Sequence, residues 1–309
     1  MRQLVGSILV IIAAICFGFM GLFRSWAGGV SVEMTLFLRF AIAGIIMAMI
    51  MPTRRLPWPR GRLLLGLIGM GAVLYVGESM FFFHGMRHIP VGLVSLLLYV
   101  YPVLVTIFAW LFLHERLTHA RIIALGLAAA GLVLTTVPII TSDQKSQLAD
   151  ANPILGIALG LGCCVSYSIY ILVGGVMTRR AGAIPASTVV ILSAAAVFGA
   201  LAFAKGDAFP SGASAWIGVF SLAIVSTVIA ITGVLFGLDR IGPVQTSTLS
   251  TVEPVMTVIV GAAFMNQQLN WLQIGGGLLI VGAAIIIARS SVKSAGAAAS
   301  ASVEIAPVH

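Results

Sequence analysis

Three charged residues interrupt long apolar stretches of the sequence: Arg39, Glu78 and Glu253. Each stretch has about the 20 residues that an α-helix needs to cross a bilayer. A charged side chain inside the hydrocarbon costs about 2.5–3.5 kcal/mol on insertion scales, and its usual roles there are pairing, ligand binding and proton transfer. These three residues are therefore the first candidates for a functional site.

Arg39 and Glu78 have similar predicted depths in the membrane. At 1.5 Å per helical residue, Arg39 lies about 10 Å and Glu78 about 9 Å below the same surface. Pairing offsets the desolvation of both charges, so we predict a buried ion pair between them. Two alternatives stay open: Arg39 could extend its side chain to the nearer interface, and Glu78 could be a protonated, hydrogen-bonded core acid.

Glu253 lies near the predicted midplane and directly precedes Pro254, as Tyr101 directly precedes Pro102 on another apolar stretch. A proline inside a helix removes one backbone donor and frees the carbonyl four residues before it, which bends the helix. Pro102 and Pro254 thus predict two kinked helices at the midplane. Glu253 is a candidate substrate ligand or proton carrier there, and the alternative is a plain bend in which Glu253 caps the backbone.

Hydroxyl and aromatic side chains flank these charges at helical spacing, which places them on shared faces. The further candidates for a substrate cavity are Tyr75, Ser79, Ser95, Tyr99, Tyr101, Tyr167, Tyr170, Ser247, Ser250 and Thr251. Such side chains suit an apolar, zwitterionic solute. The alternative is ordinary packing, with each hydroxyl bonded to a helix carbonyl.

The composition requires a membrane around these residues. Hydrophobic residues make up 60% of the 309 and charged residues 8%, against roughly 25% charged residues in a soluble domain. We predict an all-α integral membrane protein with ten transmembrane helices. Their approximate ranges are 4–23, 32–51, 63–84, 90–113, 119–139, 153–174, 184–204, 213–237, 242–264 and 270–288.

The positive charges predict orientation and argue against nucleic-acid binding. The net charge is +8, but the basic residues are spread between the apolar stretches and form no cluster. With a cytoplasmic N-terminus, the inside segments hold twelve Lys and Arg residues and the outside loops four, which is the bias of cytoplasmic loops. We predict a bacterial inner-membrane protein with both termini in the cytoplasm, whose first apolar stretch is a retained helix rather than a signal peptide.

An internal repeat appears when the sequence is shifted by 152 residues. Gly85 then meets Gly237, Pro102 meets Pro254, and eight further identities fall within 85–117. Five helices per unit is an odd number, so the second unit is inverted relative to the first. We predict two five-helix repeats (1–140 and 153–289), a periplasmic linker (141–152) and a disordered cytoplasmic tail (290–309). Inverted repeats are typical of transporters that work by alternating access, and the alternative is that duplication only enlarged the bundle.

Several short segments resemble the EamA repeat of the drug/metabolite transporter superfamily. They are Tyr101-Pro102-Val103, Leu113 to Thr118 (LHERLT) with Gly126, and their second-half partners at 253–255 (EPV) and 267–270 (QQLN). The resemblance covers residues 4–289, and within the superfamily the chain looks most like the bacterial YddG-type aromatic amino-acid exporters. Gln267 is a departure, because the family commonly has Glu there, as at Glu115.

The resemblance implies the ten-helix fold and a secondary transporter that exports amino acids, aromatic or otherwise apolar, or related small metabolites. The alternative within the same fold is efflux of lipophilic drugs or other metabolites. An intramembrane enzyme and a channel are less favoured, since the sequence has no nucleophile constellation, HExxH motif or phosphate loop. We predict no metal and no cofactor, and as partners only a small-molecule substrate and the lipid bilayer. Oligomeric state, exact substrate and coupling ion have no signature in the sequence.

Overall fold

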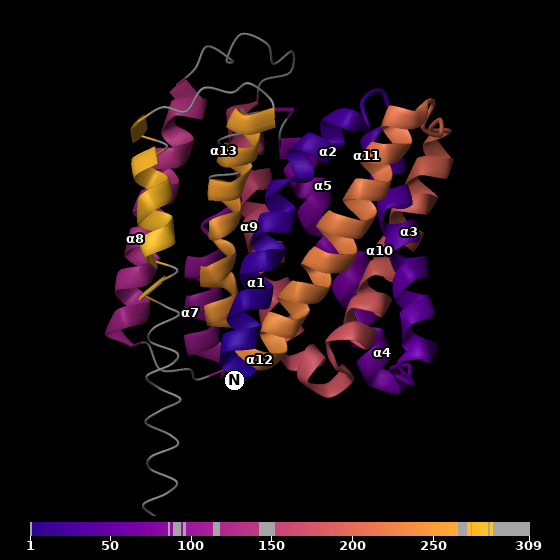
Figure 1. Ribbon diagram of the computed structural model, residues 1–309, viewed down its shortest axis with the longest axis horizontal. Coiled ribbons are helices and arrows are strands. Elements are labelled where there is room, and N and C mark those ends of the chain that lie inside the picture. The colour runs from indigo at the N-terminus through magenta and orange to yellow at the C-terminus, as the bar shows by residue number, and fades with distance from the viewer. Residues whose placement is uncertain are drawn as a thin grey trace, which may run out of the picture.

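The structure, a computed structural model, describes residues 2–85, 87–88, 94, 97–113, 118–141, 152–264, 271–272, 274–283 and 285–286. Every secondary-structure element in these ranges is a helix (Figure 1). Six described segments are long and apolar enough to cross a membrane: Arg2–Trp26, Val32–Thr53, Gly61–Gly85, Ile154–Ala181, Ala183–Lys205 and Ala213–Ser250. Shorter apolar helices cover His119–Leu134, Val252–Gly261 and Ile274–Ala283. The chain is therefore an all-helical, multi-pass membrane protein.

In the first half, the chain crosses the molecule three times before it reaches the helix break near Pro102. α1 (Arg2–Gly18) continues into α2 (Met20–Trp26), and α3 (Val32–Thr53) returns. Ser31 ends the intervening loop because its hydroxyl accepts the Met34 backbone N–H at 3.1 Å, which caps α3. α4 (Gly61–Gly69), η1 (Met70–Tyr75) and α5 (Val76–Gly85) form the next crossing, and α7 (Tyr101–Leu113) and α8 (His119–Thr141) follow.

The second half repeats this order of elements. It consists of α9 (Pro153–Ala181), α10 (Ala183–Lys205), α11 (Ala213–Ala223), η3 (Ile224–Ile229), α12 (Ala230–Ser250) and α13 (Val252–Phe264). Within α12, Gly242 has φ 77° and ψ 173°, a conformation that interrupts the helix. The interruption lies at the boundary predicted between 213–237 and 242–264, so the turn between these two stretches requires glycine at this position.

Some predicted features lie outside the described residues. They include Ser95, Glu115, Gln267, residues 142–151 of the predicted linker, and the predicted tail 290–309. Of the predicted helix 270–288, the structure describes residues 271–272, 274–283 and 285–286.

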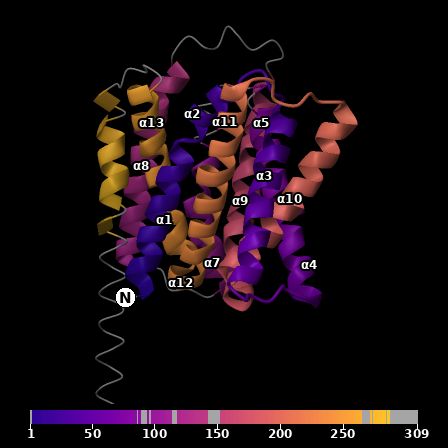
Figure 2. The same cartoon turned by 45° about the vertical axis from the view of Figure 1, so that its right-hand side comes forward.

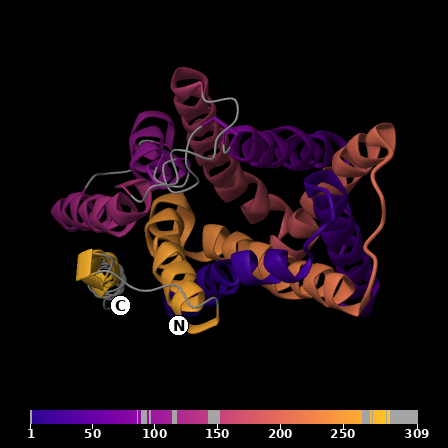
Figure 3. The same cartoon turned by 90° about the horizontal axis from the view of Figure 1, so that it is seen from above.

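The two halves are inverted and interlocked. α3 starts at the end of the molecule where α2 ends, far from the N-terminus, whereas its repeat partner α10 ends there (Figures 1 and 2). α3 packs along α10, α1 packs against α12 and α13, and α9 packs against α5 and α7. Figure 3 shows the indigo α1 beside the orange helices of the second half. Each half thus places its first helix against the other half, and the largest buried apolar cluster includes residues of both.

Among the described residues, two helical crossings contain a π-helical turn, at nearly equivalent places. η1 covers Met70–Tyr75 and η3 covers Ile224–Ile229, and the offset of 152 maps η3 onto residues 72–77. A π turn holds one residue more than an α turn and leaves the helix locally wider, and such turns are frequent at functional sites.

Candidate substrate cavity between the two halves

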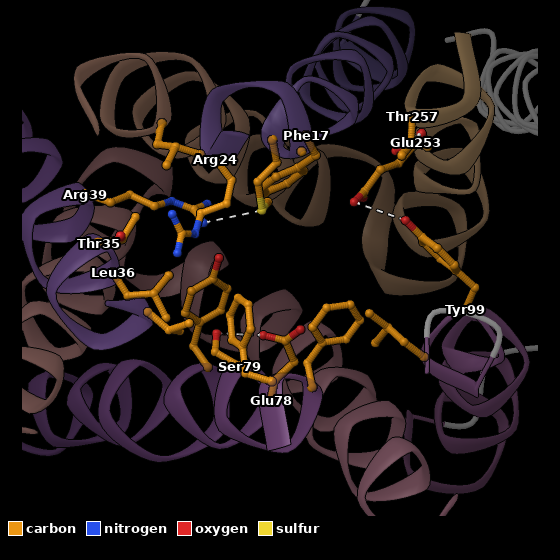
Figure 4. A pocket seen from close by; sticks show the side chains of 18 residues that line it. Phe17, Arg24, Thr35, Leu36, Arg39, Glu78, Ser79, Tyr99, Glu253 and Thr257 are labelled. Atoms are coloured by element: carbon orange, nitrogen blue, oxygen red, sulfur yellow. Dashed lines mark hydrogen bonds between the residues drawn. The ribbon is translucent and has the colours of Figure 1, made fainter. Parts of the chain in front are cut away.

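A cavity of about 330 Å³ lies between the two halves, at the lower end of the range for small-molecule sites. Its walls come from α1, α2, α3, η1, α5, the segment before α7, α11 and α13. Many of the lining residues belong to the parts of α2, α3 and α5 that lie away from the N-terminus (Figures 1 and 4). The cavity therefore lies toward that end of the molecule.

Arg39 is 3% exposed and extends from α3 into the cavity wall. Its Nε donates to Thr227 Oγ1 at 2.6 Å and its Nη2 donates to the Ser226 carbonyl at 2.7 Å. Its Nη1 faces Met20 Sδ at 3.6 Å, and the guanidinium carbon lies 5.0 Å from the centre of the Phe40 ring. The cation is thus held between the two halves by neutral groups.

The π turn η3 explains why Arg39 finds a carbonyl partner inside a helix. The Ala230 N–H bonds to the carbonyls of Val225 and Thr227, five and three residues before it. It therefore passes over the carbonyl of Ser226, four residues before it, which an α-helix would use. That carbonyl accepts from Arg39 instead.

Glu78, at the start of α5, lines the same cavity and has different partners. Its Oε2 accepts from Ser79 Oγ at 3.1 Å, and its Oε1 accepts from the Cys163 thiol at 3.8 Å. The sequence predicts a direct ion pair with Arg39. Among the described residues, Arg39 and Glu78 instead form hydrogen bonds with other groups. Arg39 does so because η3 supplies it with a hydroxyl and a carbonyl.

Glu253 reaches the cavity from the first turn of α13. Its Oε1 accepts from the Tyr99 hydroxyl at 3.3 Å, and within the described part of the chain its Oε2 has no hydrogen-bond partner. The helix is interrupted at Thr251, whose N–H bonds to the Thr248 carbonyl at 3.3 Å. Pro254 then lies in the first turn of the new helix, so this break directs Glu253 toward the cavity rather than along a continuous helix.

The equivalent break in the first half positions Tyr99. Residues 99–100 form a turn, and the Val100 N–H bonds to the Leu97 carbonyl at 3.4 Å. Pro102 occupies the second position of α7, where its missing N–H removes no helical hydrogen bond. The two breaks thus bring Tyr99 and Glu253 together from opposite halves.

Beside the cavity, aromatic rings form a continuous chain with centroid separations of 4.7 to 5.8 Å. In order of contact the rings are Phe198, Phe40, Tyr75, Tyr170, Tyr167 and Tyr101. Tyr75 alone among them lines the cavity. The structure therefore places the predicted candidates Tyr101, Tyr167 and Tyr170 in the core packing and not in the cavity wall. Tyr101 also donates to the Ser247 carbonyl at 3.3 Å.

The predicted hydroxyl candidates of the second half face their own helix. Ser247, Ser250 and Thr251 are buried and donate to backbone carbonyls three or four residues before them, at 2.6 to 2.9 Å. None of the three lines the main cavity. Thr251, Tyr99 and Pro102 border a second, apolar cavity of about 100 Å³ beside α8. Tyr75, Glu78, Ser79, Tyr99 and Glu253 are the predicted cavity candidates that line the main cavity, and Arg39 joins them.

Several lining residues are missed by the sequence reasoning. Examples are Met20, Arg24, Thr35, Phe82 and Thr257. The last three each lie four residues from Arg39, Glu78 or Glu253, so helical spacing from the charged residues could have found them. Met20 and Arg24 have no such signal.

Arg24 adds a second cation to the wall. It donates to the carbonyls of Ala27 at 3.0 Å and Val30 at 2.9 Å, which fixes the loop after α2. The wall therefore holds two guanidinium groups, Arg24 and Arg39, and two carboxylates, Glu78 and Glu253. In Figure 4 the guanidinium groups come from one side and the carboxylates from the other sides. Such a wall can bind a solute that carries both signs of charge. Among the described residues no group of His, Cys, Asp and Glu could hold a metal ion.

Comparison with known proteins identifies the family. The sequence matches the EamA-like transporter family twice, over residues 4–137 and over residues 154–289. The chain belongs to this family. The resemblance predicted from the residues is thereby confirmed, and so is the two-repeat helical fold.

Relatives that align with most of this EamA-like protein carry the name transporter. The "Uncharacterized transporter YcbK" of Bacillus subtilis is 25% identical over 282 residues and shares 88% of both chains. The "Uncharacterized inner membrane transporter YedA" of Escherichia coli K12 is 26% identical over 259 residues, 81% of this chain and 79% of that protein. A solved crystal structure superposes with a TM-score of 0.76 over 93% of this chain and 96% of its own, at 20% identity, and shows the fold alone.

Proposed function

We propose that the protein is a secondary transporter that exports amino acids, aromatic or otherwise apolar, or related small metabolites across a bacterial inner membrane. The observation that carries this proposal is the cavity between the two inverted halves, which combines both signs of charge with apolar walls. An apolar amino acid has both of these features. The YddG-type resemblance of the sequence favours the same substrate class.

Alternating access is the mechanism that the architecture supports. The cavity lies beside the aromatic chain, whose rings come from both halves and pack in or against the buried apolar core. Two inverted halves can exchange conformations about a central site, so that access opens at one end and then at the other. The π turns and proline breaks beside the cavity are places where these helices depart from regular hydrogen bonding.

Both termini are proposed to lie in the cytoplasm. The loop between α3 and α4 contains Arg54, Arg55 and Arg60 at the N-terminal end of the molecule, as the positive-inside bias requires. In this orientation the cavity faces the periplasm. Replacing Arg60 and Ser211, both exposed and at opposite ends, by cysteine in a chain lacking Cys16, Cys163 and Cys164 tests it. An impermeant thiol reagent added to intact cells should label position 211 and leave position 60 unlabelled. The reverse pattern would overturn the orientation.

The second candidate function is efflux of lipophilic compounds. It is favoured by the apolar part of the cavity wall, which includes Phe17, Leu36, Phe82, Phe83 and Leu98. Buried charges on both sides of the cavity are less suited to an uncharged lipophilic solute, because they would remain uncompensated.

Reconstitution into liposomes tests the proposal. Vesicles loaded with a panel of amino acids, with and without a pH gradient, should release one or more apolar amino acids faster than protein-free vesicles. Dependence on the gradient would identify the coupling ion as a proton. Release of lipophilic dyes with no flux of any amino acid would replace the proposed substrate class by the second candidate.

A further inference from the structure

We propose that Arg39 and Glu253 form two subsites of the cavity, which hold respectively the carboxylate and the ammonium group of one zwitterionic substrate molecule. This inference rests on the proposed transport of amino acids through the same cavity. It goes further by assigning each charged group of the substrate to one side chain.

The carboxylate subsite follows from the donors that Arg39 retains. A guanidinium has five N–H groups. Three point to partners in the protein: Nε–H to Thr227, one N–H of Nη2 to the Ser226 carbonyl, and one of Nη1 to the thioether of Met20. One N–H group each remains on Nη1 and Nη2, beside the Tyr75 hydroxyl in the cavity wall. A pair of terminal N–H groups of this kind can bind the two oxygens of a carboxylate side by side.

The burial of the Arg39 charge also supports a carboxylate subsite. All of its hydrogen-bond partners among the described residues are neutral, although the side chain is 3% exposed. A buried cation without a contacting anion is costly, and a ligand carboxylate would offset that cost. The bonds to Thr227 and Ser226 meanwhile hold the guanidinium in place, so little side-chain entropy is lost on binding.

The ammonium subsite is assigned to Glu253 rather than to Glu78 because of their remaining acceptors. Both oxygens of Glu78 already accept a hydrogen bond, from Ser79 and Cys163. Glu253 has one oxygen held by Tyr99, while within the described chain its Oε2 has no partner and can accept from an ammonium group. In Figure 4 Glu253 and Tyr99 lie across the open centre of the cavity from Arg39.

The site occurs once, although the fold is duplicated. At the offset of 152, the counterpart of Arg39 is Ile191 and the counterpart of Glu253 is Tyr101. Both counterparts are buried in the apolar core. A substrate therefore meets one carboxylate subsite and one ammonium subsite, and its orientation is fixed relative to the two halves.

The experiment compares three ligands that differ in one charged group. Phenylalanine, phenylalanine amide and 3-phenylpropanoic acid compete for transport of a labelled apolar amino acid in proteoliposomes. The wild-type protein should prefer the amino acid over each of the others by about ten- to a hundredfold, the range for a hydrogen bond to a charged group. Arg39→Gln should abolish the preference over the amide and keep the preference over the deaminated acid. Glu253→Gln should do the reverse.

Matched variants separate recognition from folding. Glu78→Gln removes the other carboxylate of the cavity wall and is expected to change the overall rate of transport. The two preferences, which are ratios between ligands, should nevertheless stay within about threefold of the wild type. Arg39→Lys keeps the positive charge but lacks the paired N–H groups of the guanidinium, so it should weaken the preference over the amide without abolishing it. This variant also tests the carboxylate subsite if Arg39→Gln does not fold.

The outcomes distinguish this inference from the proposed function. If the wild type moves amino acids but Arg39→Gln and Arg39→Lys weaken all three ligands equally, Arg39 is structural and the carboxylate subsite is wrong. If Glu78→Gln instead of Glu253→Gln removes the preference for the amine, the ammonium subsite is wrong. If the wild type neither binds nor moves any amino acid, the proposed function itself fails.

Discussion

Gly71 in η1 lies at a close approach of two helices from opposite halves, so Gly71→Ala should separate them. A Cβ built at Gly71 would lie 2.2 Å from the Val190 carbonyl oxygen and 2.9 Å from its Cα. Val190 belongs to the buried core of α10, and a backbone atom cannot rotate away as a side chain can. To restore van der Waals contact, η1 and α10 must move apart by about 1 Å.

Two opposing effects set the magnitude. Overpacking in a well-packed core costs about 1–3 kcal/mol, whereas alanine is favoured over glycine inside a helix by about 0.5–1 kcal/mol. The clash with the backbone is therefore expected to exceed the gain in helix propensity, and the free energy of unfolding should fall by roughly 1–2 kcal/mol. Gly69→Ala is the matched control, because it lies two residues earlier in the same crossing and its Cβ would meet nothing within 4 Å.

Thermal unfolding in one detergent, followed by circular dichroism, measures both variants. Gly71→Ala should unfold at a lower temperature than the wild type, and Gly69→Ala at the same or a slightly higher one. Because Tyr75 of the same π turn lines the cavity, Gly71→Ala should also slow transport. Equal unfolding temperatures of the two variants would refute the close approach of η1 and α10.

Three further substitutions address other parts of the fold. Gly242→Ala places a side chain at φ 77° and ψ 173°, which should cost about 1–3 kcal/mol and lower the unfolding temperature; no change would mean that the turn adopts another conformation. Tyr101→Phe removes the bond to the Ser247 carbonyl and should cost about 1 kcal/mol in the same assay, whereas a gain in stability would contradict that bond. Glu33→Gln breaks the ion pair with Lys205, whose side chain is 49% exposed; the effect should stay below about 1 kcal/mol and shrink with added salt, and a larger, salt-independent loss would argue against this geometry.

The fold could be predicted because it depends on properties that are averaged over long stretches of the sequence. Apolar length and Lys/Arg placement locate helices without knowledge of their contacts, and an odd number of helices per repeat implies inversion. The boundary at Gly242-Pro243 was predictable from turn chemistry. The π turns were not, because they lie in stretches such as 70–75 that are apolar on every face and therefore carry no periodic signal.

The site could be predicted only in its charged members. Arg39, Glu78 and Glu253 are conspicuous because charge is costly inside a membrane, and all three line the cavity. The partner of Arg39 could not be foreseen, since it is a carbonyl that a π turn leaves available. Tyr167 and Tyr170 were expected in the cavity, but they stack on each other and pack in the core, outside the cavity wall.

The paired π turns also record the history of the chain. A π turn arises when one residue is added to an α-helix, and the added residue rotates everything beyond it by about 100°. η1 and η3 lie within two residues of each other at the offset of 152, so two independent insertions at one place are not needed to explain them. A single insertion, already present in the ancestral five-helix unit before its gene was duplicated, accounts for both. The difference between the halves at the charged positions arose after the duplication and would then be younger than the irregular turns beside it.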